Sequence, residues 1–318
     1  MAKSPAYDDS PKTKELIESL TYRKIRKPIA VIETADNYMA IGPGMILQLN
    51  EERYFITGEA REGRFGIDDQ PKMWVKYAID LTDGSRKIIK LPFLEQFQTK
   101  VGPFTITCKR NPEKESRVLD MVRHDPRFMH GHTSRDASGA NVRIIEEIRG
   151  RSLYGIIADL DISHEEYFFE ILPGIMKKLL DALDALAALH AKGEQHGDVR
   201  SDHILQDADT RRYRWIDFDY EANYTDYDVW SVGNIVAYVV GQGNHNCKDV
   251  AKVLDERNEP CLEAKDSQLF FQHRLINLKK LFSYIPDSLN DILMRFSKET
   301  VDFYDSTEQI ISDLRSLY

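Results

Sequence analysis

The stretch HGDVRSDHI, residues 196–204, gathers several ionisable side chains around one glycine, between two segments with helical patterns. Asp198 suits chemistry best, because a carboxylate within hydrogen-bond reach of a hydroxyl can align that weak nucleophile. A second acidic group, Asp217, follows the apolar pair Trp215 and Ile216. Such a carboxylate can present the oxygen ligands that Mg²⁺ prefers. Phosphoryl transfer depends mainly on alignment and charge neutralisation, and these two residues offer both.

The elements that must position these residues fall into two groups. Residues 29–91 contain apolar runs separated by Gly, Asn and Asp turns, which predicts antiparallel strands, and NVRIIEEI (141–148) adds another strand. One amphipathic helix is predicted over 111–123, behind a capping Asn111 and a proline. After residue 150 the pattern is mainly helical, as in the apolar stripe of 172–190.

Smaller features complete this outline. HILQD and YRWIDFD are predicted to form a hairpin directly after the ionisable stretch. At the N-terminus, residues 1–12 are polar and predict a disordered tail, and a short helix is expected over 13–26.

Bulk composition limits the function classes. The 318 residues include 43 basic and 52 acidic ones, so the formal charge of -9 gives no global positive field for nucleic acid or an anionic membrane. Three widely spaced cysteines fit a reducing compartment. The most apolar segment, residues 229–240, is shorter than the roughly 20 residues that cross a bilayer. We therefore expect a cytoplasmic protein without nucleic-acid or membrane partners.

Three short motifs occur in a fixed order: HGD at 196–198, DFD at 217–219 and DVWSVG at 228–233. With the hairpin between the first two and an amphipathic helix before them, the chain resembles the protein-kinase-like superfamily over about residues 51–318. This resemblance implies an α+β bilobal fold, with a β-rich N-lobe carrying one αC-type helix and a mainly α-helical C-lobe. The expected boundaries are 1–50 for an N-terminal extension, 51–149 for the N-lobe and 150–318 for the C-lobe.

The resemblance implies roles for three residues of the C-lobe. Asp198 matches the catalytic aspartate that orients the acceptor hydroxyl, although an aspartate that only caps a turn is the alternative. Asp217 matches the DFG aspartate that holds the metal against the nucleotide phosphates. Arg200, two residues after Asp198, would replace the family's lysine that touches the transferred phosphate.

Two contacts of the scaffold are implied as well. Phe218 is expected to pack on His196, which makes that histidine structural rather than catalytic. Asp228 matches the start of the buried helix that braces the catalytic loop, and it is expected to accept backbone N–H bonds from that loop.

In the β-rich half the resemblance implies an ATP site. Lys90 lies where the family has the strand lysine that contacts the α and β phosphates, and Glu115 lies where the family has its ion-pair partner. Lys76 is a rival for the phosphate role. We prefer Lys90, because it comes one hairpin strand later and leaves room for a glycine loop before the hairpin.

The glycine loop and the hinge are less complete matches. In GEAREGRFGI, residues 58–67, Gly63 and Gly66 match the second and third glycines of GxGxxG, but Arg61 occupies the first position. Glycines serve there because backbone N–H groups can approach phosphate without obstruction by side chains. The strand NVRIIEEI resembles the hinge, with Glu146 and Ile148 at the backbone positions that bind adenine, although a plain half-buried strand would look the same.

Several positions depart from the family pattern. His203 replaces the asparagine that binds the second metal. A neutral imidazole there would suit Mn²⁺ or Zn²⁺ better than Mg²⁺, or it would only bond within the loop. Asp219 replaces the glycine of DFG and is a further candidate metal ligand. Residues 220–227 form a very short activation segment without an APE motif. Gly197 replaces the arginine that responds to activation-loop phosphorylation.

The sequence therefore predicts an ATP-dependent phosphotransferase that requires Mg²⁺ or Mn²⁺ and acts on a hydroxyl of a protein or a small molecule. The alternative is a pseudokinase, a nucleotide-binding or interaction module without efficient transfer. Arg61, His203 and Asp219 favour the alternative, whereas the four retained residues Lys90, Glu115, Asp198 and Asp217 favour the enzyme.

Overall fold

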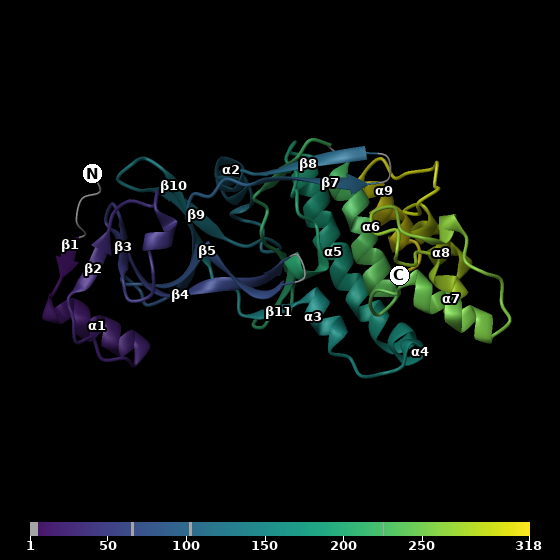
Figure 1. Cartoon of the computed structure of the whole chain (residues 1–318), viewed down its shortest axis with the longest axis horizontal. Coiled ribbons are helices and arrows are strands. Elements are labelled where there is room, and N and C mark those ends of the chain that lie inside the picture. The colour runs from purple at the N-terminus through teal and green to yellow at the C-terminus, as the bar shows by residue number, and fades with distance from the viewer. Residues whose placement is uncertain (1–5, 65–66, 102–103, 225) are drawn as a thin grey trace. The chain divides into compact units, whose positions relative to one another are not determined.

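Most of the apolar runs predicted as strands lie in one eight-stranded sheet with the order β1-β2-β3-β4-β5-β6-β10-β9 (Figure 1). The predicted antiparallel pairing is wrong for β2 and β3, which pair parallel. The computed structural model describes residues 6–64, 67–101, 104–224 and 226–318. The strands of the sheet are β1 (Ala6–Asp8), β2 (Ile29–Ile32), β3 (Ile46–Leu49), β4 (Glu52–Arg64), β5 (Ile67–Asp80), β6 (Arg86–Lys90), β9 (Gly131–Arg135) and β10 (Asn141–Glu146).

The chain folds into two units. The strand-rich unit comprises Met1–Glu95, Asn111–His124 and Met129–Ile148, and the helical unit comprises Gln96–Arg110, Asp125–Phe128 and Arg149–Tyr318. The main division therefore falls between residues 148 and 149, and the segment 96–110 belongs to the helical unit although strands of the other unit flank it in sequence.

The N-terminal residues extend the sheet. β1 pairs antiparallel with β2, and helix α1 (Pro11–Thr21) begins three residues after β1. The Asp8 carboxylate forms an ion pair with Arg53 and accepts a hydrogen bond from the Thr13 hydroxyl at 2.9 Å. The prediction of disorder over 1–12 is thus wrong for residues 6–12, because a sheet edge and a helix start supply partners that composition does not reveal.

The predicted amphipathic helix is α2 (Pro112–Val122), and its start follows the expected chemistry. The side chain of Asn111 accepts hydrogen bonds from the backbone N–H groups of Glu113 and Lys114 at 2.9 and 3.3 Å. Val118 and Leu119 are buried on its inner face. The cap fixes where α2 begins and the apolar face fixes which side packs inward, and together they position the buried Glu115.

Helices make up most of the other unit. The predicted stripe forms α5 (Leu172–His190), which runs beside α6 (Tyr227–Val240) (Figure 1). The remaining elements of this unit are β11 (Gly150–Ser152), α3 (Leu153–Ala158), α4 (His164–Glu166), β12 (Ile204–Asp207), β13 (Tyr213–Trp215), α7 (Cys247–Glu256), α8 (Asp287–Met294) and α9 (Thr307–Arg315). None of the helices in the described part of the chain has the length and apolar character needed to cross a bilayer.

A small sheet in the helical unit has no counterpart in the sequence predictions. The hairpin of β7 (Gln96–Val101) and β8 (Phe104–Arg110) pairs with β14 (Tyr220–Ala222), the strand that follows DFD directly. Ile106 and Cys108 of β8 are buried in a cluster with Tyr220 and Trp230. The segment after Asp219 is therefore held as a strand of a sheet.

Candidate active site

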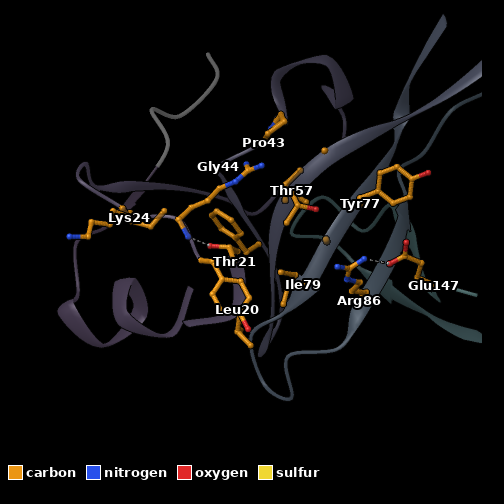
Figure 2. A pocket seen from close by; sticks show the side chains of 17 residues that line it. Leu20, Thr21, Lys24, Pro43, Gly44, Thr57, Tyr77, Ile79, Arg86 and Glu147 are labelled. Atoms are coloured by element: carbon orange, nitrogen blue, oxygen red, sulfur yellow. Dashed lines mark hydrogen bonds and ion pairs between the residues drawn. The ribbon is translucent and has the colours of Figure 1, made fainter. Parts of the chain in front are cut away.

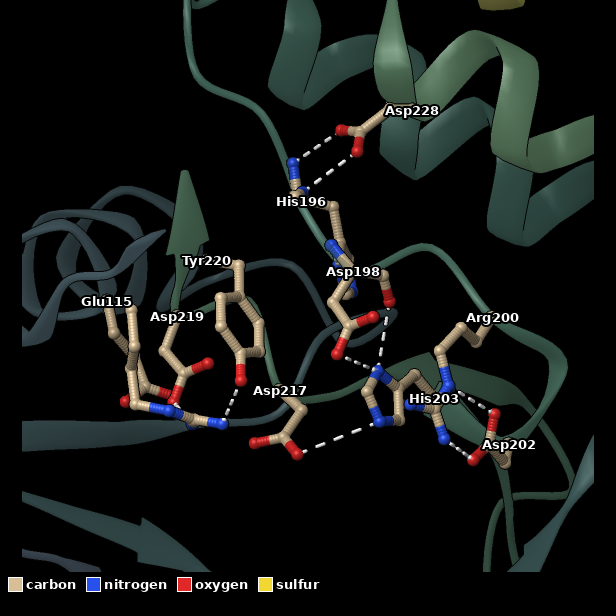
Figure 3. A network of polar contacts seen from close by, with 12 residues as sticks. Glu115, His196, Asp198, Arg200, Asp202, His203, Asp217, Asp219, Tyr220 and Asp228 are labelled. Carbon is tan, nitrogen blue, oxygen red and sulfur yellow. Dashed lines mark hydrogen bonds and ion pairs between the residues drawn. The ribbon is translucent and has the colours of Figure 1, made fainter. Parts of the chain in front are cut away.

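The loop that carries Asp198 is fixed by one buried carboxylate. Asp228, at the start of α6, accepts hydrogen bonds from the backbone N–H groups of His196 at 2.6 Å and of Gly197 at 2.8 Å (Figure 3). Gly197 has a φ of 82°, a conformation that costs glycine little. The expected bracing of the loop by Asp228 is confirmed, and it places Asp198 at a defined turn.

His196 has the structural position that was expected. Its buried ring meets Phe218 edge-on at a centroid distance of 5.9 Å and Trp215 at 4.9 Å. These contacts connect the loop to the strand and to the motif that carries Asp217. His196 thus belongs to the scaffold, and the chemistry falls to its neighbours.

His203 lies between the two carboxylates that matter most. Its Nδ1 is 2.9 Å from the backbone oxygen of Asp198, and its Nε2 is 3.7 Å from Oδ2 of Asp217 (Figure 3). Because a carbonyl oxygen only accepts, Nδ1 carries the hydrogen, and in the neutral ring Nε2 presents its lone pair to the carboxylate of Asp217. In the neutral ring Nε2 and this carboxylate can therefore serve as ligands of a divalent metal, whereas a protonated ring would form an ion pair with Asp217 instead.

Two further properties of these carboxylates are the backbone conformation of Asp217 and the raised pKa of Asp198. Asp217 has a φ of 65°, and a non-glycine residue in this left-handed region costs about 1 kcal/mol. Burial raises the pKa of Asp198, and the negative charge of Asp217 adds to that effect, whereas a protonated His203 and Arg200 oppose it. A carboxylate with a raised pKa accepts a proton more readily than an exposed one.

Asp219 has a partner that the sequence did not suggest. It forms a buried ion pair with Arg110, the last residue of β8. The guanidinium of Arg110 also donates a hydrogen bond to the Tyr220 hydroxyl at 2.7 Å. An arginine that ends an amphipathic strand gives no signal in the sequence for a partner more than a hundred residues away. The pairing commits much of the Asp219 carboxylate to Arg110.

Arg200 lies beside Asp198 but bonds to its own loop. Its Nε donates a hydrogen bond to Oδ1 of Asp202 at 2.9 Å, and a second guanidinium nitrogen bonds to Oδ2. All three residues line one pocket of the helical unit. The two-point bond holds the guanidinium at Asp202.

In the strand-rich unit the expected ion pair forms. Nζ of Lys90, at the end of β6, is 2.6 Å from Oε1 of Glu115 in α2. Arg143 of β10 binds the other oxygen of Glu115, with 3.0 Å between Nε and Oε2, and its side chain is fully buried. Arg143 was not predicted, although an arginine within the apolar run NVRIIEEI was the available signal. Lys76 is paired instead with Glu59 at 2.5 Å.

The predicted glycine loop, residues 58–67, covers the second half of β4 and the first residue of β5. Gly63 lies in β4 at an irregularity of the register, between the pairs Glu62–Gln70 and Arg64–Ile67. Gly66 lies outside the described residues. In the hinge strand, the N–H of Glu146 donates to the His130 carbonyl at 2.9 Å, and Ile148 follows the end of β10.

The strand-rich unit also contains a pocket of about 670 Å³ near the end of α1 (Figure 2). Its lining includes Leu20, Lys24 and Tyr77, and the neighbouring Arg86 and Glu147 side chains approach to 3.9 Å. None of the predicted site residues lines this pocket, so it is separate from the Lys90 ion pair.

Comparisons with solved structures agree with the architecture. The structure is similar to the kinase domain of Mycobacterium tuberculosis PknI, with a TM-score of 0.50 and 12% identity over 88% of this chain and 100% of that chain. A mutant of the same domain, in which one cysteine is replaced by alanine, gives a TM-score of 0.49 and 12% identity, over 87% and 99% of the two chains. No protein-family model and no curated protein matches the sequence. The chain has a protein-kinase-like α+β fold, as predicted.

Proposed function

We propose that this protein is an ATP-dependent phosphotransferase that uses Mg²⁺ or Mn²⁺ and phosphorylates a hydroxyl group of a small molecule or a protein. The observation that carries the proposal is the linked arrangement of Asp198, His203 and Asp217. It combines Asp198, a proton acceptor of raised pKa, with two candidate metal-ligand atoms that face each other, Nε2 of His203 and Oδ2 of Asp217.

In the helical unit, Asp198 would accept the proton of the acceptor hydroxyl as that oxygen forms its bond to the γ-phosphorus and the bond to ADP breaks. Arg200 would neutralise charge on the transferred group. The metal, held by Asp217 with His203 and with Asp219 as a further candidate ligand, would neutralise charge on the phosphates. A nitrogen ligand favours Mn²⁺ relative to Mg²⁺.

In the strand-rich unit, Lys90 would bind the α and β phosphates of ATP. Glu115 holds its Nζ at 2.6 Å, and Arg143 in turn fixes Glu115, so the ammonium is positioned before the nucleotide binds. The backbone at Gly63 and Gly66 would cover the phosphates, and the backbone at Glu146 and Ile148 would bind adenine.

The second candidate is a pseudokinase that binds nucleotide without efficient transfer. The specific observation in its favour is the ion pair of Asp219 with Arg110, which occupies a carboxylate that could otherwise serve a metal. Asp198, His203 and Asp217 argue against it, because a binding module has no need of a braced proton acceptor.

Asp198→Asn tests the proposal. General-base catalysis contributes about 10²- to 10⁴-fold, so turnover of the γ-phosphate with Mg²⁺ or Mn²⁺ should fall by that factor while nucleotide binding is retained. Asp209→Asn is the matched control, since Asp209 is an exposed turn residue that pairs with Arg149. Asp217→Asn should abolish the metal dependence of nucleotide binding. Nucleotide binding without turnover, unchanged by Asp198→Asn, would support the pseudokinase instead.

A further inference from the structure

A pocket of about 400 Å³ lies entirely within the helical unit and includes Asp198 in its lining. Its lining comprises residues 198–202, several residues of α6, Tyr154, Asn244, Phe270, Phe271 and Arg274. This volume is in the range of small-molecule sites, roughly 300–1,000 Å³. The side chain proposed to receive the hydroxyl proton is therefore part of a cavity that can hold a small acceptor.

The two arginines that line this pocket, Arg200 and Arg274, differ in whether a carboxylate pairs with them. Arg200 and Asp202 bond to each other. Among the residues that the structure describes, no carboxylate forms an ion pair with Arg274, which lines the same pocket. Burial lowers the pKa of Arg274, and Tyr154 opposes this effect. Arg274 is thus a partly desolvated cation without a counter-charge from the described residues.

The neighbours of Arg274 give the guanidinium a fixed direction. It lies over the ring of Phe271, with 4.0 Å between Cζ and the ring centroid. Asn234 of α6 and the nearby Asn244 also line the pocket, and neither side-chain amide bonds to another described residue. A planar cation in a pocket that also contains amide groups is the chemistry that recognises a carboxylate or a phosphate.

We propose that Arg274, with Asn234, binds the anionic group of a small hydroxyl compound whose hydroxyl is presented to Asp198. The acceptor class is thus a hydroxylated carboxylate or phosphate ester, and Arg274 is a specificity-determining residue. This inference rests on the proposed function. A neutral acceptor would leave the guanidinium without a counter-charge, and a cationic acceptor would be repelled by it.

The test compares three acceptor probes of similar size: glycerol, D-glycerate and glycerol 3-phosphate. ATP turnover with Mn²⁺ is measured with each probe for the natural protein, Arg274→Gln and Arg274→Lys. Arg151→Gln is the matched control, because Arg151 is an exposed arginine outside the pocket. Binding of each anionic probe without nucleotide is measured by calorimetry, which does not depend on turnover.

We expect one or both anionic probes to be preferred over glycerol. A charge-assisted bond implies that Arg274→Gln raises their KM and Kd about 10- to 100-fold with little change in kcat, whereas Arg274→Lys restores part of the affinity. The preferred probe identifies the anion as carboxylate or phosphate. A folded Arg274→Lys variant also keeps the test valid if Arg274→Gln fails to fold.

Three results would overturn the inference: equal use of glycerol and the anionic probes, anion binding unaffected by both variants, or transfer to a serine peptide but to none of the probes. Each leaves the proposed function standing if Asp198-dependent turnover persists. The absence of nucleotide binding and turnover would instead reject the proposed function itself.

Discussion

At the scale of single residues, the orientation of His203 decides how the site treats a metal. Its Nδ1–H is used by the Asp198 carbonyl, so only Nε2 is available toward Asp217. We expect His203→Asn to shift the metal preference of nucleotide turnover from Mn²⁺ toward Mg²⁺, because an amide oxygen replaces the nitrogen ligand. Titration of activity with both metals measures this. An unchanged ratio would show that His203 is not a ligand.

Arg143 makes a prediction about stability. It is fully buried and binds Glu115, so Arg143→Met leaves a buried carboxylate with Lys90 alone. Loss of one partner of a buried pair costs about 3–5 kcal/mol, and we expect the free energy of unfolding to fall by that amount in urea titrations. Arg151→Met, which breaks an exposed pair, should cost less than about 1 kcal/mol. Equal effects would contradict the assigned role of Arg143.

The sequence pointed to candidate site residues where a short motif marks them. The positions of Asp198, Asp217 and Asp228 followed from ordered motifs, and the loop contacts of Asp228 form as expected. Arg110 and Arg143 were missed, because their partners lie 109 and 28 residues away and only tertiary packing brings them together.

At the scale of elements, the DVWSVG segment owes its glycine to close helix packing. A Cβ atom at Gly233 of α6 would lie 2.2 Å from Cδ1 of Phe296, a buried ring. We expect Gly233→Ala to lower the free energy of unfolding by about 1–3 kcal/mol, because the ring must move within a packed core.

Gly174→Ala in α5 is the matched control for that variant. Apart from the chain neighbours and the nearby backbone of α5 itself, no atom lies within 4 Å of a Cβ at Gly174, so alanine should be neutral or stabilising by roughly 0.5 kcal/mol. Chemical denaturation of the two variants decides the matter, and a destabilised Gly174→Ala would refute the packing explanation.

The ion pair of Arg110 and Asp219 supports the strand that follows DFD. Arg110→Met removes the partner of a buried carboxylate and the bond to Tyr220. We expect faster hydrogen exchange of the β14 amides, with α5 unaffected. Lys109→Met is a suitable control, because the exposed Lys109 occupies the neighbouring position of β8. Unchanged exchange in Arg110→Met would show that the pair does not hold β14.

Helices were predicted correctly where the apolar periodicity was long or where a capping residue marked the start of the helix. α5 and α2 were identified by apolar spacing and by Asn111, and both form over nearly the predicted residues. The hairpin of β7 and β8 was missed although β8 has the alternating burial of a half-buried strand, and its pairing with β14 is set by distant residues. Composition also failed to predict β1, because this strand is stabilised by its pairing with β2.

At the scale of the molecule, His164 couples stability to pH. Its ring is stacked on Phe282 with 3.5 Å between centroids, Nδ1 accepts from the Tyr284 hydroxyl, and Nε2–H donates to the Val240 carbonyl. Burial lowers the pKa of His164 to about 4. The neutral ring therefore contributes stability above the unfolded pKa of about 6.5, and this contribution is lost as the pH falls from there toward 4.

We accordingly expect a lower melting temperature at pH 5 than at pH 7. His164→Gln, which cannot titrate, should reduce that difference, and the exposed His124→Gln should leave it unchanged. Thermal denaturation at the two pH values measures this. An equal pH dependence in the natural protein and His164→Gln would reject the role of His164.

The pairing of β8 with β14 also has a consequence for biosynthesis. Arg110 and Tyr220 are 110 residues apart, so a growing polypeptide completes β8 long before its partner strand leaves the ribosome. At about 5–20 residues per second, that interval lasts roughly 5–20 seconds. During this time one edge of β8 has no strand beside it, which is the state most prone to wrong intermolecular pairing. β8 is accordingly complete well before it can acquire its native neighbour β14.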